Sequence, residues 1–328
     1  MTDIKINENG VEPAEWPGQS PETGAIRAIA VLAGFMVLTL PLMPVQWIFL
    51  KTSRWAAQTF PHWYHRRVCG LLGVRLHVQG KVKSGRPTLL ISNHVSWLDI
   101  PVLSAVAPVS FVAKSEVGSW PFVSWLAKLQ RTVFVDRTRR SAVGHVTDTM
   151  RSRLNSGDTL VLFAEGTSTD GFRVLPFKSA LLSPAFAAPR VDPTRKSGSD
   201  AGADADAYTA SKPETAARWE PRSHSEAEIV VQTLSLAYTH VHGIPIGLSE
   251  RSLIGWYGDM EMGSHAWSLL KAGPIDAKIL ISDPVPLDHF ANRKVLANGA
   301  QRKVEDGVKA LLRGRPLQPP PRIQTSKT

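Results

Sequence analysis

The longest uncharged stretch of the chain lies near its N-terminus, and the pattern changes to short apolar runs after it. Residues 28–50 read AIAVLAGFMVLTLPLMPVQWIFL, with no charged side chain and one amide, Gln46. About 20 apolar residues suffice to cross a bilayer core as a helix, so the sequence predicts a membrane anchor over residues 25–50. Pro41 and Pro44 would kink or interrupt it, which leaves open a kinked span or a helix with a shallow re-entrant or interfacial piece. A buried core helix is the alternative without a membrane.

Basic residues are placed unevenly around this apolar stretch. Arg27 precedes it, whereas Lys51, Arg54, Arg66 and Arg67 follow it. Because basic flanks stay on the cytoplasmic side of a membrane helix, we expect the protein body on the cytoplasmic face of the inner (cell) membrane, anchored by the N-terminal helix. A cleaved signal peptide fits less well, since the run is long, begins far into the chain and lacks a basic leader.

After the anchor, short apolar runs bounded by Gly, Pro, Asn or Asp alternate with segments of helical spacing. Such runs predict buried strands. The predicted strands lie in residues 73–80, 87–93, 109–115, 132–137, 158–166, 229–239 and 277–285. Helical spacing predicts a helix over 143–154 and a final helix that stops at Gly314. This alternation indicates an α/β fold, with a mostly parallel central sheet flanked by helices and an N-terminal membrane helix.

Three segments lack this periodicity. Residues 1–24 are acidic and proline-bearing, residues 188–226 are small, polar and proline-bearing, and residues 315–328 are proline-rich. We expect a disordered acidic tail, a disordered insertion and a second disordered tail, because such compositions bury too little apolar surface to fold. A functional lid is the alternative for the insertion. Residues 51–187 and 227–314 are predicted to form a single α/β domain.

Composition narrows the possible partners. The chain of 328 residues has a formal net charge of +10, which suits nucleic acid, an anionic lipid surface or a phosphorylated substrate. We expect no nucleic-acid partner, because the 10 tryptophans form no recurring basic–aromatic cluster and the apolar anchor favours membrane lipids. The single cysteine, Cys69, excludes an intrachain disulfide framework, favours a reducing compartment and is expected to pack in the core.

The sequence motif that most strongly indicates catalysis begins at the end of the predicted strand 87–93. The chain there reads Asn-His-Val-Ser-Trp-Leu-Asp, which places His94 and Asp99 five positions apart. On a regular helix these side chains would lie about 140° apart, but a turn at a strand end can bring them together. Asp99 would then keep one ring nitrogen of His94 protonated while the other nitrogen accepts the proton of an attacking hydroxyl. A core histidine beside a helix-capping aspartate is the structural alternative.

Two further strand ends carry polar side chains. Arg137 ends its strand and can bind a phosphate or carboxylate, with a salt bridge or a solvated face as the alternative. Glu165, Gly166 and Thr167 follow the next strand. The glycine permits close backbone approach and its neighbours can contact a substrate, although on its own this segment is an ordinary turn. Lys178 offers a cation in the same region.

Metal binding is not expected. His240 and His242 would lie on one face of a strand, but the sequence shows no third ligand near them. We therefore expect neither a metal nor a cofactor.

Together the three strand ends resemble the glycerolipid acyltransferase family that includes the 1-acylglycerol-3-phosphate acyltransferases. That family has an Asn-His-x4-Asp block, a Phe-(Ile/Val)-Asp-Arg-like block and a Phe-Pro-Glu-Gly-Thr-like block, and the same order runs here from about Val78 to Phe186. Ala164 replaces the proline of the third block, and a fourth, proline-containing block is weak. The stretches GTSTDGFRVLPFKSALL, LAYTHVHGIPIG and WYGDM are similar to the branch that acylates lyso-ornithine lipid.

The resemblance implies an O-acyltransferase that moves a fatty acyl group from acyl-CoA or acyl-carrier protein to the free hydroxyl of a lysolipid. It implies that His94 is the base and that Asp99 orients it. The residues that would position the acceptor head group are Arg137, Glu165, Gly166 and Thr167, with Lys178 beside them. The first acceptor expected is 1-acyl-sn-glycerol-3-phosphate, which would give phosphatidic acid, and lyso-ornithine lipid is the alternative.

Two other classes of function remain open at this point. A non-catalytic membrane protein could bind lipid on the same fold, and a hydrolase could use the same His–Asp pair to transfer the acyl group to water. The sequence leaves the oligomeric state open.

Overall fold

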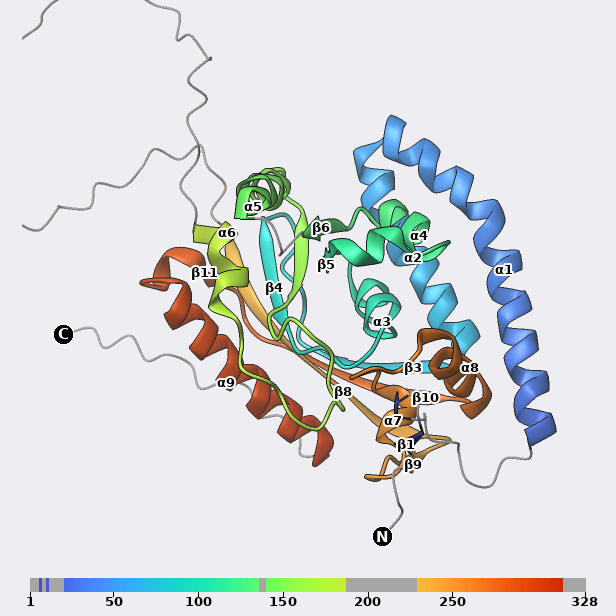
Figure 1. Cartoon of the computed structure of the whole chain (residues 1–328). Coiled ribbons are helices and arrows are strands. Elements are labelled where there is room, and N and C mark those ends of the chain that lie inside the picture. Colours follow the sequence, from blue (N-terminus) through green and yellow to red (C-terminus); the bar gives the residue numbers. More distant parts are fainter. Residues whose placement is uncertain (1–5, 8–9, 12–20, 136–139, 187–228, 315–328) are drawn as a thin grey trace, which may run out of the picture.

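A computed structural model describes residues 6–7, 10–11, 21–135, 140–186 and 229–314 (Figure 1). The predicted insertion at 188–226 and the C-terminal tail at 315–328 lie outside the described residues, so both stay predictions.

The predicted acidic tail is described only in part. Ile6–Asn7 (β1) pairs antiparallel with Gly10–Val11 (β2), and helix α1 begins at Pro21 rather than at residue 25. The remaining tail positions lie outside the described residues.

A nine-stranded sheet forms the centre of the molecule, in the order β3-β10-β8-β4-β7-β5-β6 with β9 and β11 paired to β8. The strands from β8 to β6 are parallel to one another, whereas β10 runs antiparallel to β8 and parallel to β3. The strands are β3 (Val74–Gln79), β4 (Thr88–Ser92), β5 (Ser110–Lys114), β6 (Val133–Val135), β7 (Thr159–Phe163), β8 (Val230–Val241), β9 (Ile244–Pro245), β10 (Ile275–Ile281) and β11 (Val285–Pro286). The predicted α/β class with a mostly parallel sheet is confirmed.

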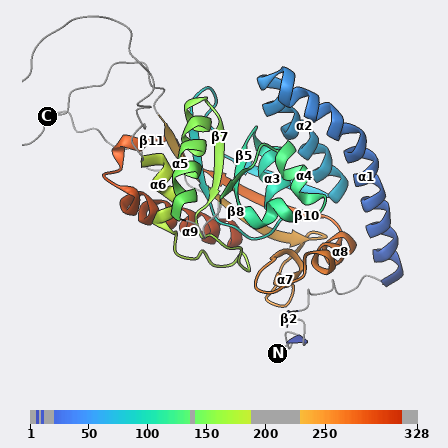
Figure 2. The ribbon, with the colours of Figure 1, turned by 45° about the horizontal axis from the view of Figure 1, so that its top comes forward.

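Helices cover both faces of this sheet (Figures 1 and 2). In both views α5, α6 and α9 lie on one side, and α1 to α4 with α8 lie on the other. The helices are α1 (Pro21–Thr52), α2 (Arg54–Leu72), α3 (Asp99–Val106), α4 (Val123–Leu129), α5 (Arg140–Asn155), α6 (Ser183–Phe186), α7 (Arg251–Ile254), α8 (Met262–Ala272) and α9 (Arg293–Leu312), with short 3-10 turns η1 (Ser115–Ser119), η2 (Ser179–Leu182) and η3 (Leu287–His289). The helices predicted over 143–154 and before Gly314 correspond to α5 and α9.

The central strands are apolar on both faces because each face packs against a separate core. Side chains alternate between the faces of a strand, and in β4 Leu90 packs in one core while Leu89 and Ile91 pack in the other. The second core includes Met150 of α5 and Val304 of α9. All five β4 side chains are buried, so this strand holds the segment that follows it at a fixed place.

Helix α1 continues through Pro41 and Pro44 and bends in its second half (Figure 1). It is the one helix among the described residues that is long and apolar enough to cross a membrane. In its most apolar 18-residue window, 17% of the residues are buried. The alternative of a buried core helix is therefore not supported.

Polar side chains attach α1 to the domain along its length. Arg27 donates to main-chain carbonyls at the C-terminal ends of α2 and α8. Thr39 shares a hydrogen bond of 2.7 Å with Tyr64 of α2. Gln46 donates to a carbonyl of α2 at 3.1 Å and to that of Leu129 at 2.8 Å. One face of α1 is thus part of the folded domain, and the other carries exposed apolar side chains such as Val37.

Cys69 packs as the sequence predicts. Its thiol is free and buried on α2, and burial raises its pKa to about 12. The thiol is therefore neutral and unreactive at physiological pH.

Packing of α9 on β8 depends on Gly307. A Cβ added to Gly307 would lie 2.8 Å from the Cβ of Ser235, whereas one added to Gly299 on the same helix meets nothing within 4 Å. We expect Gly307→Ala to lower the free energy of unfolding by about 1–3 kcal/mol through overpacking. Gly299→Ala should raise it by up to about 1 kcal/mol, because alanine is the better helix former. Denaturant unfolding of the full-length protein in detergent measures both, and equal shifts for the two variants would contradict the packing explanation.

Candidate active site

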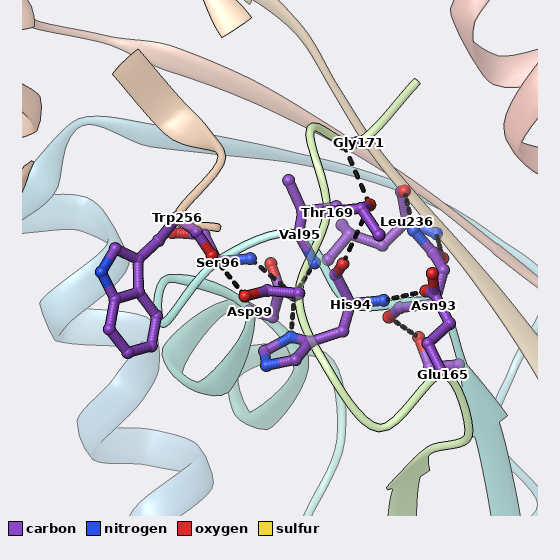
Figure 3. A network of polar contacts seen from close by, with 12 residues as sticks. Asn93, His94, Val95, Ser96, Asp99, Glu165, Thr169, Gly171, Leu236 and Trp256 are labelled. Carbon is purple, nitrogen blue, oxygen red and sulfur yellow. Dashed lines mark hydrogen bonds and ion pairs between the residues drawn. The ribbon is translucent and has the colours of Figure 1, made fainter. Parts of the chain in front are cut away.

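His94 and Asp99 meet where β4 ends and α3 begins. The chain turns over residues 93–98, and Asp99 is the first residue of α3. The Nδ1 atom of His94 lies 2.7 Å from Oδ2 of Asp99 (Figure 3). The contact expected from the strand-end turn is present, and the Asp99 side chain is buried.

Four donors converge on the Asp99 carboxylate. Oδ2 also accepts from the backbone N–H groups of Val95 at 2.7 Å and Ser96 at 3.1 Å, and Oδ1 accepts from the Tyr238 hydroxyl at 2.9 Å. Burial and the neighbouring Asp99 carboxylate raise the pKa of Tyr238 well above its ordinary value, so its hydroxyl remains a donor. Because an ionised carboxylate only accepts hydrogen bonds, Nδ1 of His94 must carry its proton and Nε2 keeps a free lone pair.

The imidazole of His94 is held flat beside a large cavity. It stacks on Phe163, the last residue of β7, with ring centroids 4.0 Å apart and planes at 16°. His94 lines a cavity of about 700 Å³. Most of the wall is apolar and comes from α1, α2, α3, α4, β5 and α8, while the loop after β7 closes one side.

Glu165 holds the backbone of the His94 loop. Its Oε1 accepts from the N–H of His94 at 2.7 Å (Figure 3). Its Oε2 accepts from the N–H of Leu175, also at 2.7 Å. The side chain is 1% exposed and does not line the cavity. The prediction that Glu165 contacts the acceptor head group is therefore not supported by its position, because both oxygens are already bound to backbone donors.

Other contacts fix the same two loops. Asn93 exchanges two hydrogen bonds with the backbone of Leu236 in β8, at 2.9 and 2.8 Å. Thr169 donates from its backbone to the carbonyl of His94 at 3.0 Å. The loops after β4 and β7 are thus bonded to each other and to β8, which fixes the backbone that carries His94.

The other predicted substrate-binding residues separate into three groups. Gly166 and Thr167 line the cavity beside His94, and Gly166 has a φ of 75°, which favours glycine. The Lys178 side chain is exposed and is not part of the cavity wall. Its backbone N–H donates to Ala164, so the prediction that it faces the substrate is not supported. Arg137 lies outside the described residues.

Sequence reasoning missed several residues of the site. Lys114 ends β5 and Glu116 follows it, and both are exposed while lining the cavity. Trp120 and Trp256 also line it. Lys114 lies at the end of a predicted strand, as Arg137 does, so the same rule would have found it, whereas no local signal marks Tyr238 or Trp256.

The histidines considered for metal binding have other contacts. His240 lies 3.8 Å from a carboxylate oxygen of Asp276, and His242 contacts the carbonyl of Ala272. No group of three or more His, Cys, Asp or Glu side chains suited to a metal occurs within the described ranges.

Comparison with known proteins assigns the chain to a family. The model of the family described as Acyltransferase matches residues 73–194. The lyso-ornithine lipid O-acyltransferase of Brucella abortus is 41% identical over 294 residues, which cover 90% of this chain and 98% of that protein. The chain belongs to the lysolipid acyltransferase family. It is an acyltransferase of the lysolipid type.

Further relatives agree with this assignment. The lyso-ornithine lipid O-acyltransferase of Rhizobium meliloti is 36% identical over 284 residues, which cover 85% of this chain and 85% of that protein. The 1-acyl-sn-glycerol-3-phosphate acyltransferase of Neisseria meningitidis is 37% identical over 37% of the chain and 48% of its own length. The crystal structure of PlsC from Thermotoga maritima shares the fold, with a TM-score of 0.58 at 18% identity, covering 90% of this chain and 97% of that one.

The role of Glu165 can be tested through pH. Burial raises its pKa to about 7 from 4.5, against the backbone donors that favour the ionised form. Between these values the folded acyltransferase keeps a proton that the unfolded chain has lost, so this carboxyl makes folding less favourable as pH rises from about 4.5 to 7. We expect the stability of the wild type to fall relative to Glu165→Gln across this range, on the order of 2–3 kcal/mol.

The same variant removes an acceptor from a buried backbone N–H, because the amide of Gln presents its NH2 group to one of the two donors. Glu165→Gln should therefore lower kcat, since the His94 backbone loses a fixed contact. Thermal unfolding at several pH values and steady-state kinetics measure the two effects. Glu305→Gln, at an exposed carboxyl of α9, is the control and should show neither. A wild type and Glu165→Gln with parallel pH curves would refute the raised pKa.

Proposed function

We propose that this acyltransferase transfers a fatty acyl group to the free hydroxyl of lyso-ornithine lipid. The observation that carries this proposal is the extent of similarity. The lyso-ornithine lipid O-acyltransferases of Brucella abortus and Rhizobium meliloti align over nearly the whole chain, whereas the Neisseria meningitidis 1-acyl-sn-glycerol-3-phosphate acyltransferase aligns over 37% of it. Of the two acceptors that the sequence resemblance implies, the relatives favour the second.

The His–Asp pair supplies the chemistry in this proposal. Nε2 of His94 removes the proton of the acceptor hydroxyl while the hydroxyl oxygen attacks the carbonyl carbon of the acyl thioester. The tetrahedral adduct collapses as the C–S bond breaks, and the imidazolium returns the proton to the leaving sulfur. Asp99 stabilises the transient positive charge on His94 and keeps the ring oriented through Nδ1.

Different parts of the cavity wall suit the acyl chain and the head group of the substrate. The apolar wall along α1 and α2 suits a fatty acyl chain, and acyl-CoA or acyl-carrier protein would deliver the thioester to it. Lys114, Gly166 and Thr167 line the cavity and would face the acceptor head group, with Lys114 opposite its carboxylate. Arg137 is proposed for the same role on sequence grounds alone.

A second candidate acceptor is 1-acyl-sn-glycerol-3-phosphate. The relative from Neisseria meningitidis is 37% identical over 123 residues, and Lys114 would suit a phosphate as well as a carboxylate. The two acceptors therefore require a direct comparison.

The decisive measurement offers both lysolipids, side by side, to the purified full-length protein with a labelled acyl thioester. We expect diacylated ornithine lipid as the main product by mass spectrometry. Phosphatidic acid as the main product would overturn the acceptor assignment, and release of free fatty acid without either product would indicate a hydrolase. His94→Ala should lower kcat by about 10²–10⁴ while the protein remains folded and membrane-bound, which separates an enzyme from a lipid-binding protein.

We also infer that α1 lies in the membrane interface with α2 instead of crossing the bilayer. Helix α2 packs along α1, and the ties from Arg27 and Gln46 hold both ends of α1 to the domain. A perpendicular span would carry α2, with Arg66 and Arg67, into the hydrocarbon, where unpaired charges are costly. The apolar outer face of α1 would sit in one leaflet, and the cytoplasmic face of the cell membrane stays a prediction.

Tryptophans on this side of the molecule support a membrane surface. Trp47 of α1 and Trp55 and Trp63 of α2 are 53%, 74% and 42% exposed. Lys51 lies over the ring of Trp47, and Arg67 lies near that of Trp63. Exposed tryptophans with adjacent cations are typical of the headgroup region of a bilayer.

The interfacial arrangement predicts that membrane binding depends on these tryptophans. Replacing Trp47, Trp55 and Trp63 by serine should lower partitioning into anionic vesicles by at least about tenfold, because the apolar area that inserts is reduced. Vesicle sedimentation measures it. Val295→Ser is the control, since Val295 is 48% exposed on α9 on the other side of the sheet. Unchanged binding of the triple variant would favour a fully inserted span.

A further inference from the structure

The segment between β9 and β10 leaves the sheet and passes over the catalytic loops. The Trp256 N–H donates to the carbonyl of Val95 at 3.0 Å, and the Ser168 hydroxyl donates to the carbonyl of Trp256. Gly255 lies so close that an added Cβ would be 3.1 Å from the Thr169 carbonyl. A single residue, Trp256, is therefore bonded through its backbone to both the loop after β4 and the loop after β7.

These contacts fix the indole of Trp256 in the cavity wall. Its Nε1–H donates to the carbonyl of Met260 at 2.8 Å, so the polar edge of the ring is satisfied and the ring cannot rotate freely. Trp256 meets Trp120 in a T-shaped arrangement, with centroids 5.9 Å apart and planes at 80°. Because the two ring planes are nearly perpendicular, a face of one ring and a face of the other meet at a right-angled corner. Both tryptophans line the cavity.

Other residues of the cavity wall reach the solvent. Lys114, Glu116 and Gly258 are exposed and also line the cavity, so they mark its opening. Glu116 belongs to the 3-10 turn η1 that leads directly into Trp120. Trp120, Trp256 and Glu116 thus line the same cavity, and Trp120 directly follows the turn that carries Glu116.

We infer that Trp120, Trp256 and Glu116 form a subsite for a primary ammonium group on the acceptor lipid. An ammonium ion is attracted to the face of a tryptophan ring, most strongly where water is partly excluded, and a carboxylate adds an ion pair. A phosphate monoester would be repelled by Glu116 and would gain nothing from the ring faces. This inference rests on the proposed function, because the free amino group of an ornithine head group is the charge that the subsite would bind.

Acetylation of the side-chain amine removes the positive charge of the acceptor lipid and leaves the rest of the lipid unchanged. The purified full-length protein is assayed with lyso-ornithine lipid and with the same lipid acetylated on its free side-chain amine. We expect the wild type to favour the free amine in kcat/KM by about tenfold. Trp256→Leu should abolish most of this preference by raising KM for the free amine, whereas Trp256→Phe, which keeps a ring face, should retain part of it.

Three controls make the result interpretable. Glu116→Gln and Trp120→Leu should each reduce the same preference, which covers the case in which Trp256→Leu does not fold. Trp267→Leu, at an exposed tryptophan of α8 outside the cavity wall, should leave the preference unchanged. Equal kcat/KM for both lipids in the wild type, or an equal loss for both in Trp256→Leu, would overturn the subsite. Product from neither lipid would instead refute the proposed acceptor.

Discussion

The geometry of this acyltransferase depends on one buried carboxylate. Asp99 is 0% exposed, and removing an ionised carboxylate from water is costly unless hydrogen bonds replace the lost hydration. Four donors do so: the His94 ring, two backbone N–H groups in the same turn and the Tyr238 hydroxyl from the neighbouring strand. Because each donor must lie within hydrogen-bonding distance of one group, satisfying the charge also fixes the turn, the tautomer of His94 and the spacing of β4 from β8.

That constraint holds the imidazole proposed as the base next to an apolar cavity. His94 presents Nε2 to a space that α1 helps to enclose, since Val31, Phe35 and Thr39 are part of its wall. The helix predicted as a membrane anchor is thus also a wall of the candidate active site. Its outer apolar face meets lipid in the proposed arrangement while its inner face meets the substrate, so membrane binding and substrate access depend on the same helix.

Local patterns in the sequence predicted much of this structure, and long-range contacts account for what they missed. Short apolar runs predicted the strands, and the position of His94 at a strand end predicted its contact with Asp99. Both patterns involve residues that are close together in the sequence. The role of Glu165 differed because its partners, the N–H groups of His94 and Leu175, are chosen by the fold. Tyr238 lies 139 positions from Asp99, so nothing near the motif pointed to it. The apolar composition of α1 also could not show that one face packs on protein.

The position of Trp256 offers a reason why one catalytic arrangement can serve different acceptors. His94, Asp99 and Glu165 all lie within residues 73–194, which the family model matches, whereas Trp256 lies beyond them. The segment that carries Trp256 is nevertheless bonded through its backbone to both catalytic loops. In the proposed arrangement, a change in this segment would alter the surface facing the head group while Asn93, Thr169 and Glu165 still hold the two loops. In the proposed arrangement, the His–Asp pair and part of the head-group site lie within residues 73–194, and Trp256 joins that site from outside them through a few backbone hydrogen bonds.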